Sequence, residues 1–560
     1  MDQNKGLQDF TPSRWDPAAL PNLPIFNRLV NHAHLRNTVC VRDVDASISM
    51  THHQLLTGVV NLRNDIHGNP AFSLDRTDHE ESDVSIGLLA PGGCQFAVGF
   101  LATLALGAVC VPLSTAYPQQ ELSYFVQKAR IAFLLVHHDC VGKVRDLRLY
   151  MKEKHDIDLY YLCLKDYILQ PLIPLSTIII SSQQPPDESR AGLVIFTSGT
   201  SGPPKGAVLR RRTLGIGVQN VIDLYSIEAT DVIMHCLPVH HATGILVTFL
   251  PFITAGGCVE FHHKFDAVKT WERWARGDVT YFSGVPTIYS RLVATYKRNF
   301  EIKEKSLVES YKGAAARFKG FLCGTSSPNA RLRDEWKLLT GKRLIERYGA
   351  SEIGIVFSIP LKNNSAVPIG SAGRTAPGVD MKLSSYPEGE IMVRRPDMLS
   401  EYLYNPDATR KALDNDGYFR TGDLARVEGE HYFILGRMST DILKSGGYKI
   451  SALDVEREIL DQDYVDEAIV VGMDDEEFGQ RVAAAIVLKK DVKLSIDRLR
   501  KDLSHKLARY KLPTVLRVVQ QMPKTPLGKI SKAKVTQDFF GPGRKEGLQI
   551  WQPQHVKSRL

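Results

Sequence analysis

The sequence lacks the features of secreted and of zinc-binding proteins. Its eight cysteines are scattered along the chain without a Cys-x-x-Cys pair, so neither a zinc site of that type nor a secreted disulfide framework is expected. We expect these cysteines to be reduced and mostly buried. The N-terminal stretch contains Asp2, Asp9 and Asp16 and no apolar core segment, so no signal peptide is expected.

The sequence also has no uninterrupted apolar run long enough for a membrane helix. Residues 96–113 are uncharged, but Gly107 and Pro112 interrupt them, and a membrane span needs about 20 continuous apolar residues. We therefore predict a core helix that leads into a buried strand here, and no membrane span.

Positive charge is abundant only near the C-terminus. The chain of 560 residues has a net charge of +8, yet residues 489–560 alone hold eighteen Lys and Arg against five Asp and Glu. Such a region attracts phosphate groups, whether of nucleic acid or of a nucleotide-like cofactor. No nucleic-acid-binding motif accompanies it, so we expect no nucleic acid as a partner.

The chain is too long for one core and predicts two or more domains. From residue 84 onward, strand-like and helix-like runs alternate, which is typical of parallel sheets covered by helices, an α/β fold. The expected strands are 84–90, 109–113, 132–136 and 192–196, and the expected helices are 95–107 and 121–129. Residues 1 to about 80 are expected to be an irregular lead-in with one helix at 53–64.

One loop sequence indicates phosphate binding. It directly follows the predicted strand 192–196 and reads Thr197-Ser198-Gly199-Thr200-Ser201-Gly202-Pro203-Pro204-Lys205-Gly206. Glycine lets backbone N–H groups close around a phosphate, hydroxyls add donors, and Lys205 adds a positive charge. The spacing differs from that of a P-loop. A flexible Ser/Gly linker is the alternative, but linkers seldom follow a buried strand and carry a lysine.

Further motifs follow in order along the chain. They are Leu237-Pro238-Val239-His240-His241, Gly284-Val285-Pro286-Thr287-Ile288-Tyr289, Gly324-Thr325-Ser326-Ser327, Arg347-Tyr348-Gly349-Ala350-Ser351-Glu352, Arg420-Thr421-Gly422-Asp423, Leu435-Gly436-Arg437-Met438, Lys444-Ser445-Gly446-Gly447 and Gly528-Lys529-Ile530. Taken singly, His241 suits a core position, and Glu352 and Lys529 suit the solvated surface. The occurrence of all these motifs in one order favours functional roles for them instead.

Together with the phosphate loop, these motifs resemble the adenylate-forming superfamily, which includes acyl-CoA synthetases, and the resemblance covers most of the chain. It implies ATP, Mg²⁺ and coenzyme A as cofactors, with Glu352 and Thr200 at the metal, which suits the preference of Mg²⁺ for oxygen ligands. The implied ATP-binding residues are Thr197, Ser198, Gly199, Thr200, Ser201, Gly202, Lys205, Gly324, Thr325, Arg347, Tyr348, Gly349, Asp423 and Arg437.

The resemblance also implies the catalytic and acceptor residues. The implied catalytic residues are Lys529, Glu352, Thr200 and His241, and the implied CoA-binding residues are Lys444, Ser445, Gly446 and Gly447. It places the large AMP-binding domain at residues 1–436 and a small mobile α+β lid domain at residues 437–560, with a helix at 453–460 and strands at 467–472 and 481–489.

Within the superfamily, the sequence is most similar to malonyl-CoA synthetases. In that branch a basic residue at the position of Arg291 would pair with the distal carboxylate of malonate. Thr243 and Ala350, the other implied substrate-binding positions beside His241, depart from the branch pattern, as does the loop at 324–327. The acid is thus expected to be a short diacid such as malonate, or another short- or medium-chain acid.

Three functions remain open. The first is a carboxylic acid–CoA ligase, acting on malonate, on a medium-chain monoacid or on a secondary metabolite. The second is an adenylation enzyme that loads a carrier protein. Only 31 residues follow Lys529, too few for a fused carrier domain, so the carrier would be a separate protein. The third is a nucleotide-binding scaffold without catalysis, against which Glu352 and Lys529 argue.

The final tripeptide Ser558-Arg559-Leu560 is close to a peroxisomal address. We therefore expect recognition by a peroxisomal import receptor and a peroxisomal location, with the cytoplasm as the alternative. A peroxisomal location would suit a role in fatty acid metabolism.

Overall fold

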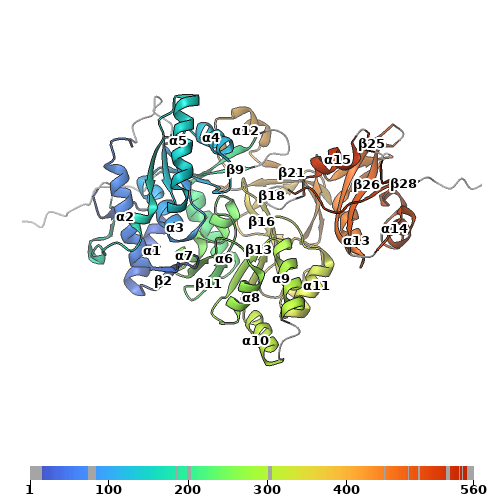
Figure 1. Cartoon of the computed structure of the whole chain (residues 1–560), viewed down its shortest axis with the longest axis horizontal. Helices are drawn as coiled ribbons and strands as arrows, with labels where there is room; N and C mark the ends of the chain where they lie inside the picture. Colours follow the sequence, from blue (N-terminus) through green and yellow to red (C-terminus); the bar gives the residue numbers. More distant parts are fainter. Residues whose placement is uncertain are drawn as a thin grey trace, which may run out of the picture.

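The chain builds two large mixed sheets and a smaller C-terminal sheet that lies at one end of the molecule (Figure 1). The computed structural model describes residues 16–72, 83–182, 187–197, 203–300, 305–446, 448–476, 478–489, 492–524, 530–541, 543–544 and 546–551. Of the predicted site residues, Ser198, Gly199, Thr200, Ser201, Gly202, Gly447 and Lys529 lie outside this part of the chain, as does the tripeptide 558–560.

The first large sheet has seven strands in the order β20-β10-β9-β5-β4-β6-β7. Its bounds are β4 Ser85–Leu89, β5 Val109–Leu113, β6 Phe133–Val136, β7 Tyr160–Cys163, β9 Ala191–Thr197, β10 Lys205–Arg210 and β20 Glu401–Tyr402. The inner strands are parallel, while β10 and β20 add antiparallel pairs at one edge. The neighbouring helices are α3 Gly93–Leu106, α4 Gln119–Lys128 and α5 Val141–His155.

The second large sheet has nine strands in the order β17-β16-β15-β14-β13-β11-β12-β2-β3. Its bounds are β2 Val39–Asp43, β3 Ile48–Thr51, β11 Val232–His235, β12 Cys258–Phe261, β13 Tyr281–Gly284, β14 Gly320–Cys323, β15 Leu344–Ala350, β16 Gly354–Ser358 and β17 Arg374–Thr375. Its helices are α1 Pro24–Leu35, α2 His52–His67, α6 Val218–Leu224, α7 Leu250–Thr254, α8 Ala267–Trp274, α9 Pro286–Asn299, α10 Lys305–Ala316 and α11 Ala330–Thr340. Five neighbouring pairs at its centre are parallel.

Two smaller sheets follow. One has four antiparallel strands, β18 Asp380–Leu383, β19 Glu388–Arg394, β21 Phe419–Glu428 and β22 His431–Arg437, and helix α12 Pro406–Ala412 precedes β21. The C-terminal sheet has six strands, β23 Ile442–Ser445, β24 Tyr448–Ser451, β25 Val465–Asp475, β26 Gly479–Leu488, β27 Val515–Val518 and β28 Leu548–Ile550. Its helices are α13 Ala452–Leu460, α14 Ile496–Leu503 and α15 Lys532–Phe540. The division of the chain at 436/437, and any motion of its later part, stay predictions.

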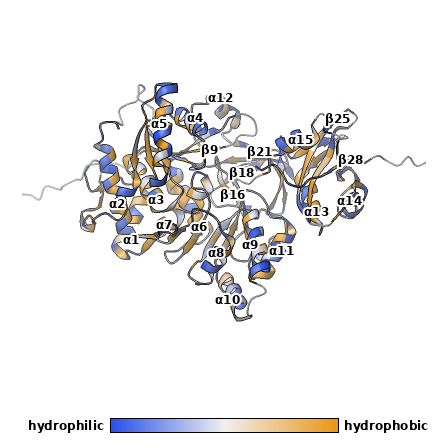
Figure 2. Cartoon of the chain, viewed as in Figure 1, coloured by the Kyte–Doolittle hydropathy of each residue, from blue (hydrophilic) through white to orange (hydrophobic). Residues whose placement is uncertain are grey.

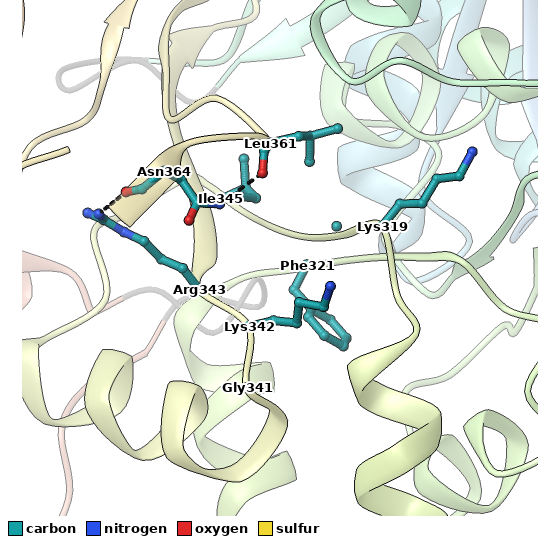
Figure 3. A pocket seen from close by; sticks show the side chains of 9 residues that line it. Lys319, Phe321, Gly341, Lys342, Arg343, Ile345, Leu361 and Asn364 are labelled. Atoms are coloured by element: carbon teal, nitrogen blue, oxygen red, sulfur yellow. Dashed lines mark hydrogen bonds between the residues drawn. The ribbon is translucent and has the colours of Figure 1, made fainter. Parts of the chain in front are cut away.

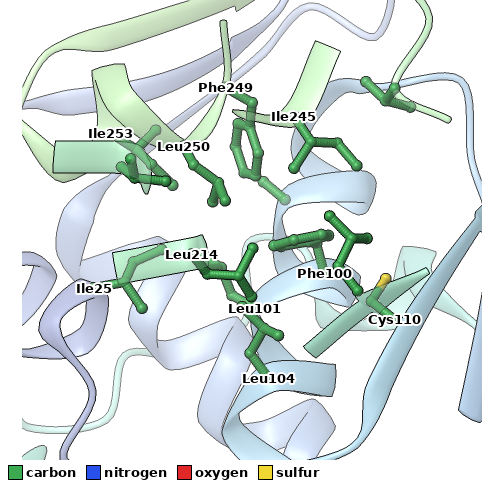
Figure 4. Packing of buried hydrophobic residues seen from close by; sticks show 14 of the residues in the cluster. Ile25, Phe100, Leu101, Leu104, Cys110, Leu214, Ile245, Phe249, Leu250 and Ile253 are labelled. Carbon is green, nitrogen blue, oxygen red and sulfur yellow. The ribbon is translucent and has the colours of Figure 1, made fainter. Parts of the chain in front are cut away.

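The main core lies around α3, which has no charged residue and is buried along its whole length. Phe100 and Leu101 of α3 face Phe249 and Leu250 of the segment that enters α7 (Figure 4). In Figure 2, hydrophobic residues fill the strands, while the outer helices turn hydrophilic faces to the surface. Because an all-apolar helix is stable in water only when every face is covered, α3 sits inside the molecule.

Most predicted elements are confirmed within a few residues. The stretch 96–113 forms α3 and the fully buried strand β5, as expected. All eight cysteines are free and most are buried. In the part of the chain that the structure describes, no helix is long and apolar enough to cross a membrane.

The expected irregular lead-in is wrong. Residues 16–72 contain α1, β2, β3 and α2, as well as the short strand β1 Ala19–Leu20, which pairs with β8 Ile179–Ile180. Helix α1 begins at Pro24, which suits the first turn of a helix, and it buries Phe26, Leu29 and Ala33 at helical spacing. This periodicity is a usable sequence signal.

Candidate active site

The two large sheets approach one another where β9 ends and the turn between β15 and β16 begins. Thr197 is the last residue of β9, and its hydroxyl oxygen Oγ1 lies 3.4 Å from Oε1 of Glu352 in that turn. Lys205 begins β10 opposite Thr197. The predicted phosphate-binding sequence therefore leaves one sheet and returns to it beside a carboxylate from the other.

Tyr402 of β20 joins these two groups. Its hydroxyl donates to Glu352 Oε1 at 3.0 Å, and Lys205 Nζ lies 5.3 Å from the centre of its ring. Burial, followed by the charge of Glu352, raises the pKa of Tyr402 well above its usual range. The tyrosine therefore remains a neutral donor that orients the Glu352 carboxylate.

A buried ion pair holds the turn that carries Glu352. The Arg395 side chain pairs with Asp397 at 2.6 Å, and both side chains are 4% exposed. Arg395 Nη1 also donates to the carbonyls of Ile353 at 3.2 Å and Ile355 at 2.9 Å. Because breaking a buried pair is costly, this arrangement fixes the backbone that directly follows Glu352.

A second polar cluster joins the end of β15 to β21 and β22. The Tyr348 hydroxyl donates to Asp423 Oδ2 at 2.7 Å, and Arg437 Nε donates to Asp423 Oδ1 at 2.9 Å. The register of β21 and β22 sets Asp423 directly opposite Arg437. Burial opposes the charge of Arg437, but Asp423 outweighs it and raises the pKa of the arginine. Three of the predicted nucleotide-binding residues are thus in direct contact.

The remaining predicted nucleotide residues lie around the β14 and β15 ends. Arg347 Nη2 donates to the Ser283 hydroxyl at 3.3 Å. A Cβ on Gly324 would lie 3.1 Å from the Arg347 guanidinium carbon, and one on Gly349 would lie 2.0 Å from the Gly354 carbonyl oxygen. Close packing against backbone therefore requires glycine at 349, which is an explanation that needs no ligand, whereas at 324 the Arg347 side chain would have to shift by a few tenths of an ångström. Thr325 is exposed and has a φ of 75°.

The predicted acid-binding residues come from separate elements. His241 precedes the π-helical turn Thr243–Val247, and Ala350 is the last residue of β15; the side chains of His241, Thr243 and Ala350 are half-buried. Arg291 lies on the exposed face of α9. A role for these four residues in binding one acid stays a prediction.

The neighbour of His241 was not singled out by the sequence reasoning. The His240 ring lies 4.3 Å from the His241 ring and 5.6 Å from that of Tyr117. Burial, and then the adjacent His241, lower the pKa of His240 to about 3. His240 is therefore neutral at physiological pH.

The predicted CoA-binding residues lie at the start of the C-terminal sheet. Lys444 and Ser445 end β23, and Gly446 follows with a φ of 56°, which favours glycine. Tyr448, just beyond, stacks on Tyr510 with ring centres 4.3 Å apart, and both rings are exposed. The Tyr448–Tyr510 pair was also missed, because its two members are far apart in sequence.

A separate cavity lies away from these residues, at the opposite ends of β14 and β15. It measures about 210 Å³ and is lined by Lys319, Lys342, Arg343 and Leu361, among others. In Figure 3 the Arg343 and Lys319 side chains point away from one another. Arg343 donates instead to the backbone carbonyls of residues 364 and 367. Since these cations do not converge, the cavity is not the site that the motifs predict.

Tyr402, Arg395 and Asp397 are the main residues that the sequence reasoning missed near Glu352. Residues 395–403 directly follow β19 and carry no motif. The alternation of Arg395 and Asp397 with apolar neighbours is a weak signal, because exposed pairs of this kind are common on surfaces.

The fold joins two large α/β sheets to a small C-terminal sheet, and its two polar clusters bring several motif residues into contact. Residues 42–403 match the AMP-binding enzyme family, and residues 454–529 match the AMP-binding enzyme C-terminal domain. The chain belongs to the family of AMP-binding enzymes.

Similar proteins span nearly the same length. A protein named malonate–CoA ligase from Arabidopsis thaliana is 31% identical over 80% of this chain and 77% of its own. A protein named CoA ligase from Gibberella moniliformis is 29% identical over 93% of this chain and 95% of its own. The fold is also that of ATP-bound MatB from Rhodopseudomonas palustris, with a TM-score of 0.80 at 24% identity over 93% of this chain and 99% of that one.

Proposed function

We propose that this protein is an ATP-dependent carboxylic acid–CoA ligase that works through an acyl-adenylate, with malonate or a similar short diacid as the acid. The observation that carries the proposal is the contact of Glu352 with Thr197, because it sets a carboxylate where the phosphate-binding sequence leaves its strand. The similarity to named CoA ligases over most of the chain supports it.

In the first half-reaction, a carboxylate oxygen of the acid attacks the α-phosphorus of ATP, and the bond to the pyrophosphate oxygen breaks. Asp423 keeps lone pairs free beside its bonds to Tyr348 and Arg437, so it can accept from the ribose hydroxyls. Lys205 offers a positive charge to the leaving pyrophosphate. In this proposal Lys529 adds a second cation in the same step.

The donors near Glu352 suit Mg²⁺, which prefers oxygen ligands. Glu352 supplies a carboxylate whose orientation is set by Tyr402, and Thr200 would supply a hydroxyl. When bound, the ion neutralises phosphate charge as it builds up.

In the second half-reaction, the CoA sulfur attacks the acyl carbon and AMP leaves. Gly446 leaves room for a narrow pantetheine arm because it has no side chain, and the predicted neighbour Gly447 would extend that path. The exposed Tyr448–Tyr510 pair offers a flat surface for an adenine ring, and Lys444 beside it is exposed to a phosphate.

A panel of acids tests the proposal. Purified protein with Mg·ATP and CoA should release AMP with malonate faster than with acetate, hexanoate or octanoate. Preference for a medium-chain monoacid would support the ligase activity and refute the assignment of a diacid substrate. AMP release that needs a carrier protein in place of CoA would identify the carrier-loading alternative, and the absence of acid-dependent ATP–pyrophosphate exchange would leave only a nucleotide-binding scaffold.

We also propose that Ser558-Arg559-Leu560 acts as a peroxisomal address that an import receptor reads, in keeping with a role in fatty acid metabolism. A fluorescent fusion that ends in these residues should co-localise with a peroxisomal marker, and deletion of the tripeptide should move it to the cytosol. Identical distributions of the two fusions would refute the address.

A further inference from the structure

Lys532 is a largely buried cation at the N-terminus of a helix. It is the first residue of α15, and its side chain is 14% exposed. Positive charge at a helix N-terminus opposes the helix dipole, and burial also disfavours the charged form. The position therefore requires compensation from nearby carboxylates.

Two carboxylates from different elements compensate the charge of Lys532. Lys532 Nζ lies 2.6 Å from Asp441 Oδ1 and 2.9 Å from Glu456 Oε1. Glu456 belongs to α13 and also accepts from the Val470 backbone N–H at 2.8 Å. Burial opposes the charge of Lys532, but Glu456 and Asp441 outweigh it and raise the pKa of the lysine.

Asp441 connects Lys532 to the predicted nucleotide-binding residues. Its second oxygen, Oδ2, accepts from the backbone N–H of Arg437 at 2.9 Å. The Arg437 side chain in turn pairs with Asp423 at 2.9 Å. A continuous chain of polar contacts thus runs from Lys532 in α15 through Asp441 and Arg437 to Asp423 in β21.

The Asp441 backbone is held by two bonds, from its N–H to the Arg437 carbonyl at 2.8 Å and from the Ala452 N–H to its own carbonyl at 2.7 Å, so only its carboxylate depends on Lys532. Its carboxylate is held on one side by Lys532 and on the other by the Arg437 N–H. Removal of the lysine would leave Asp441 and Glu456 buried as like charges, and Asp441 would turn towards water. The Arg437 N–H would then lose its acceptor, and the start of its side chain would be held only by the pairing with β21 and by the bond from the Asp441 N–H to the Arg437 carbonyl.

We propose that Lys532 is a positioning residue for nucleotide binding, acting through Asp441 to hold Arg437 on Asp423. The proposal rests on the proposed function, because it takes Asp423 and Arg437 as the groups that receive the ATP ribose. It adds a residue of the C-terminal helix α15 to the determinants of ATP affinity.

The test compares Lys532→Met with Lys534→Met, a matched control at an exposed position of the same helix. Lys532→Met should raise the KM for ATP and the calorimetric Kd for ATP about tenfold, with kcat changed less than threefold. Lys532→Arg should restore most of the affinity. Lys534→Met should match the wild type.

A double-mutant cycle separates this role from a purely structural one. Asp441→Ala should weaken ATP binding to a similar extent, and the Asp441→Ala/Lys532→Met pair should be no worse than either single variant. Fully additive losses would overturn the proposal. If Lys532→Met fails to fold, Lys532→Met/Glu456→Gln removes one of the two buried acids and is used in its place.

Limited trypsin digestion gives a readout that does not depend on activity. Cleavage after Arg437 should become faster in Lys532→Met, relative to cleavage after the reference residue Arg544, because the Arg437 side chain leaves Asp423. Unchanged cleavage together with unchanged ATP affinity would overturn the inference and leave the ligase intact. A wild type that binds no ATP would overturn the proposed function as well.

Discussion

The Tyr402 hydroxyl donates to the Glu352 carboxylate at 3.0 Å across a sequence separation of 50 residues. This bond orients Glu352 towards the end of β9, where Thr197 lies 3.4 Å from the same oxygen. Two segments far apart in the sequence therefore build one side of the predicted phosphate-binding region. The position of the carboxylate depends on a residue that belongs to no motif.

We expect Tyr402→Phe to lower kcat/KM for Mg·ATP about tenfold, since a hydrogen bond to a charged group contributes roughly 1.5–3 kcal/mol. Raising the Mg²⁺ concentration should recover part of the loss. Glu352→Gln should lose roughly 10²-fold or more and should not recover, because the ligand charge itself is gone. The control is Tyr404→Phe, two residues away at an exposed position. An unchanged Tyr402→Phe enzyme would show that the bond is not needed.

Substitutions in the C-terminal region should impair one half-reaction and leave the other largely unchanged. Lys529→Ala should lower acyl-adenylate formation roughly 10²-fold or more, because a charge is lost where phosphoryl transfer occurs. Thioester formation from synthetic acyl-adenylate should change little. Gly447→Trp should do the reverse, since an indole would obstruct the pantetheine arm. Pyrophosphate release and thioester formation are measured separately, and equal damage to both by Lys529→Ala would contradict the assignment.

The sequence predicted the parts of the fold that local patterns determine. The stretch 96–113 reads as a core helix and strand because it is uncharged and is interrupted at Gly107 and Pro112, and the structure confirms it. The antiparallel additions β10 and β20 were not predicted, because their partners are set by tertiary packing. Helix α1 was missed although its apolar spacing is regular.

The site shows the same contrast between features set by local sequence and features set by tertiary packing. Tyr348, Asp423 and Arg437 were predicted from motifs and lie in contact. Tyr402 and Lys532 carry no local signal, because a tyrosine or lysine acquires its role only from the carboxylate that the fold places beside it. Motifs name the groups that touch a ligand more readily than the groups that orient them.

Acid should destabilise the protein through buried neutral histidines. His235 is 2% exposed and lies 2.9 Å from the Gly244 carbonyl oxygen through Nε2, and burial lowers its pKa from 6.5 to about 4. Its folded pKa lies below the unfolded value, so the stabilisation is complete above pH 6.5 and is lost as the pH falls towards 4. Over that window one such group contributes about 3 kcal/mol.

His235→Gln keeps a donor for Gly244 but removes the titration. Its melting temperature should therefore fall less steeply between pH 7 and pH 4.5 than that of the wild type. This holds even if the two proteins already differ in melting temperature at pH 7. The control is His34→Gln, at an exposed position of α1. Parallel pH profiles for His235→Gln and the wild type would show that His235 is not among the groups responsible.

We predict that Arg291 contributes to the choice of acid. It is exposed on α9, whereas Tyr289 and Leu292 beside it are buried. If the distal carboxylate of malonate pairs with Arg291 in a site that closes on binding, Arg291→Ala should lower kcat/KM for malonate roughly 10²-fold, because an unpaired charge would then be buried. An exposed pair contributes about 1 kcal/mol or less, so a loss below fivefold would contradict this role. Monoacids of equal length should be little affected, and Arg298→Ala on the same helix is the matched control.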